Sequence, residues 1–308
     1  MRTSHFLSFP IRNKTIERII NSIAQNNVIM DKRILLPTDF SKNALHAVRY
    51  ALDLYEKLNC EFYFLNVFQG DSYSTSGLII PEPGSAAYET RKKKSEENFV
   101  KLLDMLELHH DNPKHSHYTI STFNVLSEAI KQTIAENDIE LVIMGTRGAT
   151  ANREIIFGGN TVNAMEKIRE CPVLAVPPDT RFSTPKEIVF PTDYKTAFKR
   201  KELSYLIEIA MMHNSAIRVL HVTKKTELTD VQQKNKNLLN TILETVDHSF
   251  HVLSYKDVSD GITAFVESRG SDMIAFINSK HFFFGSVFSK PLVKEIGYDA
   301  TVPILALH

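Results

Sequence analysis

The segment Ile34-Leu-Leu-Pro-Thr-Asp-Phe-Ser41 decides the fold, because the chain repeats it as Ile188-Val-Phe-Pro-Thr-Asp-Tyr-Lys195. Each copy is a short apolar run that ends in Pro-Thr-Asp, a pattern typical of a buried strand followed by a turn. Recurrence of such a segment indicates an internal duplication. Further matches are then expected in the residues that follow each copy.

Two later segments do repeat, in the same order. Glu140-Leu-Val-Ile-Met144 matches Asp272-Met-Ile-Ala-Phe276, and Pro172-Val-Leu-Ala-Val176 matches Pro303-Ile-Leu-Ala-Leu307. The separation falls from 154 residues at the first pair to 132 at the second, so the first copy holds extra residues between them. The turn-rich stretch 70–87 is the candidate for that insertion. Three matches in one order predict two diverged copies of one unit.

Within the first copy, predicted strands alternate with predicted helices. Short apolar or β-branched runs indicate strands at 34–36, 62–68, 118–123, 141–145 and 173–176. Apolar residues at helical spacing predict a helix after Ser41 as N-cap, and others around 99–106, 126–136 and 161–169. Near-continuous apolar strands separated by helices are typical of a parallel sheet covered on both faces. The expected fold class is α/β, with two tandem doubly wound, five-stranded parallel-sheet domains at 30–180 and 181–308.

Composition narrows the function classes. The 308 residues include 36 Lys and Arg and 36 Asp and Glu, and this balance argues against a nucleic-acid-binding surface of the usual basic kind. The two cysteines, Cys60 and Cys171, fit a reducing compartment. No run of about 18 apolar residues predicts a membrane span, and the first residues do not resemble a signal peptide. We therefore expect a cytoplasmic protein that contacts neither nucleic acid nor membrane.

The segment 1–29 precedes the repeat and has its own pattern. Ile16, Ile19, Ile20 and Ile23 form one stripe of a short helix. Two interpretations stay open for this N-terminal extension: an accessory helix, or translation that truly starts at Met30.

The turn after the first strand is one candidate site. In doubly wound sheets, ligands bind beyond the carboxyl ends of the strands, where the strand order reverses. Pro37, Thr38 and Asp39 fall at such an end, where the Asp39 carboxylate can accept hydrogen bonds from a base or a ribose. The alternative is that Asp39 helps to cap the following helix.

A glycine-rich segment is the second candidate. Gly145-Thr-Arg-Gly148 follows the fourth strand, and after nine residues Gly158-Gly159-Asn160-Thr161 opens a helix. Glycines let the backbone approach an anion, and helix N-terminal N–H groups favour phosphate. The segment has neither the Walker pattern nor the dinucleotide GxGxxG pattern. Arg147 lies inside it and either reaches a phosphate or points to solvent.

Together these segments resemble the universal stress protein family in its tandem two-domain form, from about Met30 to the C-terminus. The resemblance rests on the motif Pro37-Thr-Asp-Phe-Ser41 and on the spacing Gly145-x2-Gly148-x9-Gly158. The resemblance implies a Rossmann-like, adenine-nucleotide α-hydrolase-like fold. It also implies binding of ATP or another adenine nucleotide, with or without Mg2+, in domain 1 only. The implied nucleotide-binding residues are Pro37, Thr38, Asp39, Val67, Met144, Gly145, Arg147, Gly148, Gly158, Gly159, Asn160 and Thr161.

Both copies depart from the family pattern. The hydroxyl residue that normally follows the third glycine is Gly159 here, although Asn160 and Thr161 come next. The second copy keeps Pro-Thr-Asp but has lost the GxxG and carries Phe282–Phe284 in the corresponding loop. Bulky rings oppose close approach of a backbone to phosphate. The second copy is therefore interpreted as a structural half without a nucleotide.

The sequence leaves three functions open. The first is a stress-response regulator in which the nucleotide biases a surface read by an unknown protein partner, with the halves packed as an intramolecular pseudo-dimer or paired again as a homodimer. The second is a nucleotide-free interaction scaffold. The third is a slow ATPase, although no GxSxG or HExxH motif predicts an enzyme and Asp39 is the one obvious carboxylate near the site.

A histidine-rich segment, His109 to His117, is interpreted as a solvated connection rather than a metal site. Its imidazoles could ligate a transition metal, but no carboxylate or thiolate pattern completes a tetrahedral set.

Overall fold

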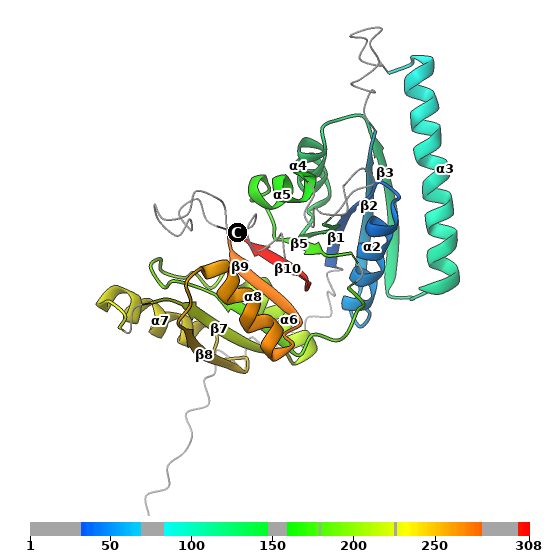
Figure 1. The fold of residues 1–308 in the computed structure, drawn as a ribbon. Coiled ribbons are helices and arrows are strands. Elements are labelled where there is room, and N and C mark those ends of the chain that lie inside the picture. The colour runs from blue at the N-terminus through cyan, green and yellow to red at the C-terminus, as the bar shows by residue number, and fades with distance from the viewer. Residues whose placement is uncertain (1–31, 69–82, 147–158, 179, 225–226, 279–300) are drawn as a thin grey trace, which may run out of the picture. The chain divides into compact units, whose positions relative to one another are not determined.

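The computed structural model describes residues 32–68, 83–146, 159–178, 180–224, 227–278 and 301–308 (Figure 1). They belong to one compact unit, Lys32–His308. The predicted N-terminal helix, most of the 70–87 insertion, Arg147, Gly148, Gly158 and Phe282–Phe284 lie outside the described residues.

The first half alternates strands and helices as predicted. Its elements are β1 (Lys32–Pro37), α2 (Lys42–Leu54), β2 (Cys60–Val67), α3 (Ala86–His109), β3 (His115–Thr122), α4 (Leu126–Asn137), β4 (Leu141–Gly145), α5 (Gly159–Lys167) and β5 (Val173–Val176).

The second half repeats the alternation. Its elements are β6 (Glu187–Pro191), α6 (Ser204–His213), β7 (Ala216–Val222), α7 (Asp230–Ile242), β8 (His248–Leu253), α8 (Val258–Arg269), β9 (Met273–Ile277) and β10 (Ile304–Leu307).

All ten strands form one sheet, in the order β3-β2-β1-β4-β5-β10-β9-β6-β7-β8. Neighbours within each half run parallel, whereas β5 and β10 pair antiparallel with Ile304 opposite Ala175. The α/β fold with a doubly wound sheet in each half is thus confirmed. The structure adds that the last strands of the two halves join them into a single sheet.

Helices cover both faces of this sheet (Figure 1). On one face, α2, α3, α6 and α7 pack into a core that runs through both halves and includes the fully buried Tyr55 and Leu206. On the other face, α4, α5 and α8 supply Ile130, Met165 and Ile262 to a second core. Continuous burial on both faces explains why the central strands are apolar along their length. In the described part of the chain, every helix is too short or too polar to cross a membrane.

The histidine-rich segment is a connection only at residues 110–114, between α3 and β3. His109 ends α3, and His115 and His117 lie on β3 with half-buried rings. The His115 ring lies 4.9 Å from the ring of Phe62, edge to face. Burial lowers the pKa of both His115 and His117. The prediction of a solvated connection was therefore wrong for His115 and His117, because alternate residues of this edge strand are partly buried.

The halves differ most after their first strands. In the first half, α2 begins at Lys42, and the Ser41 side chain accepts from the Ala44 N–H, as predicted for an N-cap. In the second half, residues 192–203 form neither helix nor strand, and α6 begins only at Ser204. The second half therefore lacks a helix N-terminus directly after its first strand.

Candidate functional site

The carboxyl ends of β1, β2 and β4 bring together the two segments singled out in the sequence. Strand β1 lies between β2 and β4, with Pro37 opposite Leu65 on one side and Leu35 opposite Val142 on the other. The strand order of this half reverses between β1 and β4. This reversal is the position at which doubly wound sheets bind ligands.

The turn after β1 is held by a set of short hydrogen bonds. The Thr38 N–H donates to the Leu65 carbonyl at 2.8 Å, and the Phe40 N–H donates to the Thr38 hydroxyl at 3.0 Å. The Ser41 N–H donates to Asp39 Oδ1 at 3.0 Å. Asp39 thus takes the local role that was the alternative interpretation, while its side chain stays exposed. The exposed carboxylate also keeps the ligand role open.

A residue that the sequence analysis missed completes this turn. The Asn66 side-chain amide donates to the Thr38 carbonyl at 2.7 Å. Asn66 precedes Val67, which was predicted as a site residue and lies partly buried against the α4 side of the sheet. The sequence signal was available in the repeat, since Leu65-Asn66-Val67 corresponds to Leu220-His221-Val222 and both central side chains carry N–H donors.

Close backbone packing explains the glycine that ends β4. An ideal Cβ at Gly145 would lie 2.9 Å from the Asn43 carbonyl oxygen in the first turn of α2. The Gly145 carbonyl accepts from the Thr161 hydroxyl of α5 at 2.8 Å. The first turns of two helices, α2 and α5, are therefore both fixed against the end of β4.

The residues around Gly145 that were predicted as site residues differ in burial. Met144 is 6% exposed, and its side chain packs into the core rather than toward the edge. Thr146 is fully buried, and its hydroxyl has no hydrogen-bond partner among the described residues. Gly159 and Asn160 open α5 and are exposed. An added Cβ at Gly159 would meet nothing within 4 Å.

In the second half, side chains of the protein bond the corresponding turn after β6. The Asp193 carboxylate pairs with the Lys195 ammonium at 3.1 Å. From α7, Gln232 donates to the Asp193 carbonyl and Asn235 to the Tyr194 carbonyl, both at 2.7 Å. The Tyr194 ring is 2% exposed. Side chains from α7 and Lys195 thus bond the turn after β6.

The glycine at the end of β4 has no counterpart in the second half. Ile277, 6% exposed, ends β9 at the position that corresponds to Gly145. Among the described residues, α6 starts only at Ser204, so its first turn is not placed directly after β6 as α2 is after β1. Within the ranges that the structure describes, the close approach of a helix turn to a strand-ending glycine is therefore seen at β4 and not at β9.

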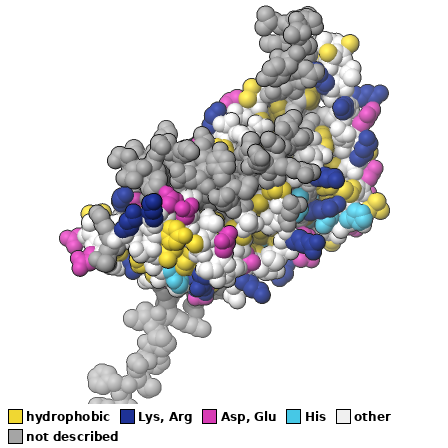
Figure 2. Space-filling view, in the orientation of Figure 1, with side chains coloured by type: hydrophobic (Ala, Val, Ile, Leu, Met, Phe, Trp, Pro, Cys, Tyr) yellow, Lys and Arg dark blue, Asp and Glu magenta, His cyan; other side chains and the backbone are white. Residues whose placement is uncertain are grey.

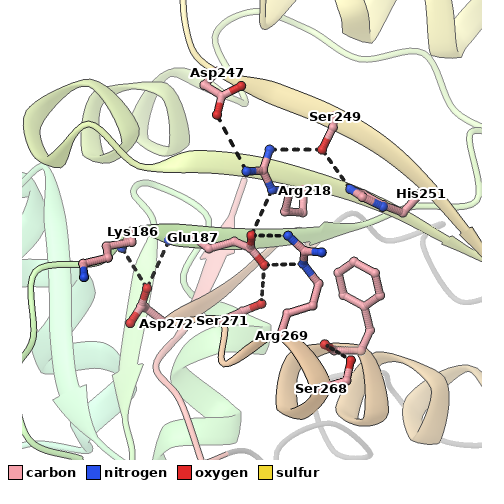
Figure 3. Close-up of polar contacts among 11 residues, drawn as sticks. Lys186, Glu187, Arg218, Asp247, Ser249, His251, Ser268, Arg269, Ser271 and Asp272 are labelled. Atoms are coloured by element: carbon pink, nitrogen blue, oxygen red, sulfur yellow. Dashed lines mark hydrogen bonds and ion pairs between the residues drawn. The ribbon is translucent and has the colours of Figure 1, made fainter.

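A charged network lies at the opposite, amino-terminal ends of the second half's strands (Figure 3). Glu187 begins β6 and accepts two bonds from Arg269 at 2.6 and 2.7 Å, one from Ser271 at 2.7 Å and one from Arg218 at 2.9 Å. The Arg269 bonds, followed by those from Ser271 and Arg218, lower the pKa of Glu187 to about 2 against the opposing effect of burial. Since its charges are matched within the protein, we assign the network a structural role.

The visible surface carries mixed charge. Figure 2 shows basic and acidic side chains interspersed on this face. This distribution agrees with the zero formal net charge of the chain.

Comparison with known proteins identifies the first half. The profile of the universal stress protein family matches residues 30–177. A universal stress protein of Methanocaldococcus jannaschii is 29% identical over 168 residues, which cover 51% of this chain and 89% of the relative.

Solved structures extend the similarity in fold to both halves. A universal stress protein from Archaeoglobus fulgidus superposes with a TM-score of 0.65 at 20% identity, covering 89% of this chain and 95% of that one. A putative universal stress protein from Pseudomonas aeruginosa gives 0.57 at 10% identity, covering 90% and 93%. At these identities the second half shares the fold alone, whereas residues 30–177 belong to the universal stress protein family.

Proposed function

We propose that the first half binds ATP or a related adenine nucleotide at the carboxyl ends of β1 and β4, and that the second half binds none. The contrast between the two edges carries the proposal. At the first edge, Gly145 packs against α2 beside an exposed Asp39 and the start of α5. At the second edge, Lys195 pairs with the Asp193 carboxylate, and Gln232 and Asn235 bond the backbone of the turn. The match of residues 30–177 to the universal stress protein family supports the same assignment, because the glycine spacing is that of the family's nucleotide-binding pattern.

The residues present fit such a ligand. The Asp39 carboxylate is an acceptor for ribose or base, and the exposed first turn of α5 offers N–H groups to phosphate. The buried Thr146 hydroxyl adds a polar group just beyond β4. A Cβ at Gly145 would meet the backbone of α2, so only glycine allows the present packing at this strand end. Mg2+ would come with the phosphates, with Asp39 as the nearby carboxylate.

The consequence we propose is regulatory rather than catalytic. Nucleotide binding would favour one arrangement of the first half, and a protein partner in the cytoplasm would read that arrangement during stress. The rival is a nucleotide-free interaction scaffold. The specific observation in its favour is Gly159, which replaces the hydroxyl residue of the family pattern at the start of α5.

Calorimetric titration of the full chain with ATP, ADP and AMP tests the proposal. We expect saturable binding at about one site per chain that Asp39→Ala weakens by roughly tenfold, the effect of one hydrogen bond to a charged group. Asp193→Ala removes the matching carboxylate from the second half and should leave the affinity unchanged. Folded wild-type protein that binds none of the three nucleotides would refute the proposal and favour the scaffold.

The same samples distinguish a slow ATPase. Release of phosphate from ATP that disappears in Asp39→Ala would assign turnover to this site. Release that persists in the variant would indicate a contaminating enzyme.

A further inference from the structure

The two halves build the turn after their first strand with the same hydrogen bonds. Thr192 N–H donates to the Leu220 carbonyl at 2.9 Å, Tyr194 N–H to the Thr192 hydroxyl at 3.1 Å, and Lys195 N–H to Asp193 Oδ1 at 2.9 Å. Each bond repeats one described above for the first half. The turn thus has the same hydrogen-bonded geometry in both halves.

One position of this turn is filled by different residues in the two halves. Asn66 donates to the Thr38 carbonyl at 2.7 Å, and His221 Nδ1 lies 2.8 Å from the Thr192 carbonyl. An amide and an imidazole share little in shape, but both present an N–H to that oxygen. The structure therefore requires a donor at this place rather than a particular side chain.

The donor matters because the turn is strained and its carbonyl is enclosed. Phe40 and Tyr194 have φ of 60° and 56°, a left-handed conformation that costs about 1–2 kcal/mol for a residue with a Cβ. Thr38 is 7% exposed and Thr192 is 2% exposed, so an unbonded carbonyl here would have little access to water. The side-chain donor satisfies the carbonyl and holds the peptide in one orientation.

That orientation bears directly on Asp39. A trans peptide is planar, and its C=O and N–H point in opposite directions. Asn66 draws the Thr38 C=O toward β2, so the Asp39 N–H is directed away from β2. The bond from Asn66 thereby sets the direction from which the Asp39 residue meets a ligand.

We infer that Asn66 is a positioning residue for the nucleotide, acting through the Thr38–Asp39 peptide. The inference rests on the proposed function of the same edge. It assigns to a residue outside the glycine pattern a share of the affinity for the nucleoside part of the ligand. Asn66 need not touch the ligand for this effect.

The test is ATP titration of Asn66→Ala and Asn66→His in the full chain, with thermal unfolding of each variant without nucleotide. Asn66→Ala should weaken ATP binding by about tenfold, because it removes the side-chain bond to the Thr38 carbonyl and so loosens the Thr38–Asp39 peptide. Asn66→His restores the donor found in the second half and should bring the affinity back to within about threefold of wild type.

The second half supplies the matched control. His221→Ala removes the same bond where no ligand binds, so it should lower the unfolding temperature and leave the ATP affinity unchanged. If His221→Ala does not fold, His221→Phe replaces it, because a phenyl ring fills similar space and has no N–H donor. Equal loss of affinity in the variants of both halves, or wild-type affinity in Asn66→Ala, would overturn the inference. Absence of ATP binding by the wild type would instead refute the proposed function, and the inference with it.

Discussion

Two glycines at the candidate site differ sharply in what surrounds them. At Gly145 an added methyl group would approach the backbone of Asn43 to 2.9 Å, whereas at Gly159 it would enter open space. Backbone cannot move aside as a flexible side chain can. A residue with a side chain does not fit at Gly145 because the backbone of α2 packs against it.

Substitution of each glycine by alanine should separate these cases. Gly145→Ala should lower the free energy of unfolding by about 1–3 kcal/mol, the usual effect of overpacking. Gly159→Ala should change it by less than about 0.5 kcal/mol. Urea unfolding followed by circular dichroism measures both. Equal stability of the two variants would show that α2 shifts to accommodate the methyl group.

The sequence predicted some residues of the candidate site and missed others. The motif located Asp39 and Gly145, and the structure brings both to one edge of the sheet. Met144 was also among the predicted site residues. Its side chain packs into the core on the α4 side of the sheet, because neighbouring residues of a strand face opposite ways. Asn66 was missed because its role depends on a contact with Thr38, which lies in a different strand connection.

At the scale of elements, the bounds of apolar strands were predicted better than those of a polar edge strand. The strands at 141–145 and 173–176 match β4 and β5 to the residue, since both are apolar along their length. The edge strand β3 was displaced toward its C-terminal end in the prediction, because His115 and Ser116 read as polar connection. The boundaries predicted for the two domains stay predictions.

Glu187 links three elements of the second half, because it begins β6 and is bonded by Arg218 of β7 and Arg269 of α8. Its folded pKa of about 2 lies below its ordinary value of 4.5. The carboxylate therefore stabilises the fold above its ordinary pKa, and this contribution disappears as pH falls from about 5 through 2.

Glu187→Gln should lower the free energy of unfolding at pH 7 by about 2 kcal/mol, because it weakens bonds from charged donors. The difference from wild type should shrink between pH 5 and pH 2, which urea unfolding at a series of pH values would show. Asp247→Asn is the matched control, since Asp247 lies 3.7 Å from Arg218 and is 74% exposed. Its effect should stay below about 0.5 kcal/mol.

For the whole molecule, contacts between the halves extend beyond the pairing of β5 with β10. The Lys32 ammonium of β1 lies 3.0 Å from Glu140 and 2.9 Å from Glu208 of α6, and 4.4 Å from the centre of the Tyr205 ring. The His213 ring lies 3.0 Å from the Leu54 carbonyl at the end of α2. These contacts enclose the shared core, so we expect the halves to unfold together.

A double-mutant cycle on Lys32→Met and Glu208→Gln measures this connection. We expect a coupling energy of about 1 kcal/mol in urea unfolding, since the Lys32 side chain is 11% exposed. The pair Lys92–Glu96, at 3.9 Å with both side chains about half exposed, is the control and should give less than about 0.5 kcal/mol. Two separate unfolding transitions would contradict a shared core.

The antiparallel pairing of β5 and β10 has a consequence for how the two copies have changed. Because the halves run in opposite directions, their carboxyl ends lie at opposite margins of the sheet. Replacements at one margin, such as Lys195 and Ile277, leave the other margin untouched. Natural selection can then keep one copy's binding residues while the other copy accumulates substitutions, provided that the shared core is preserved. A duplicated gene thus acquires a second half whose surface can evolve separately from the first.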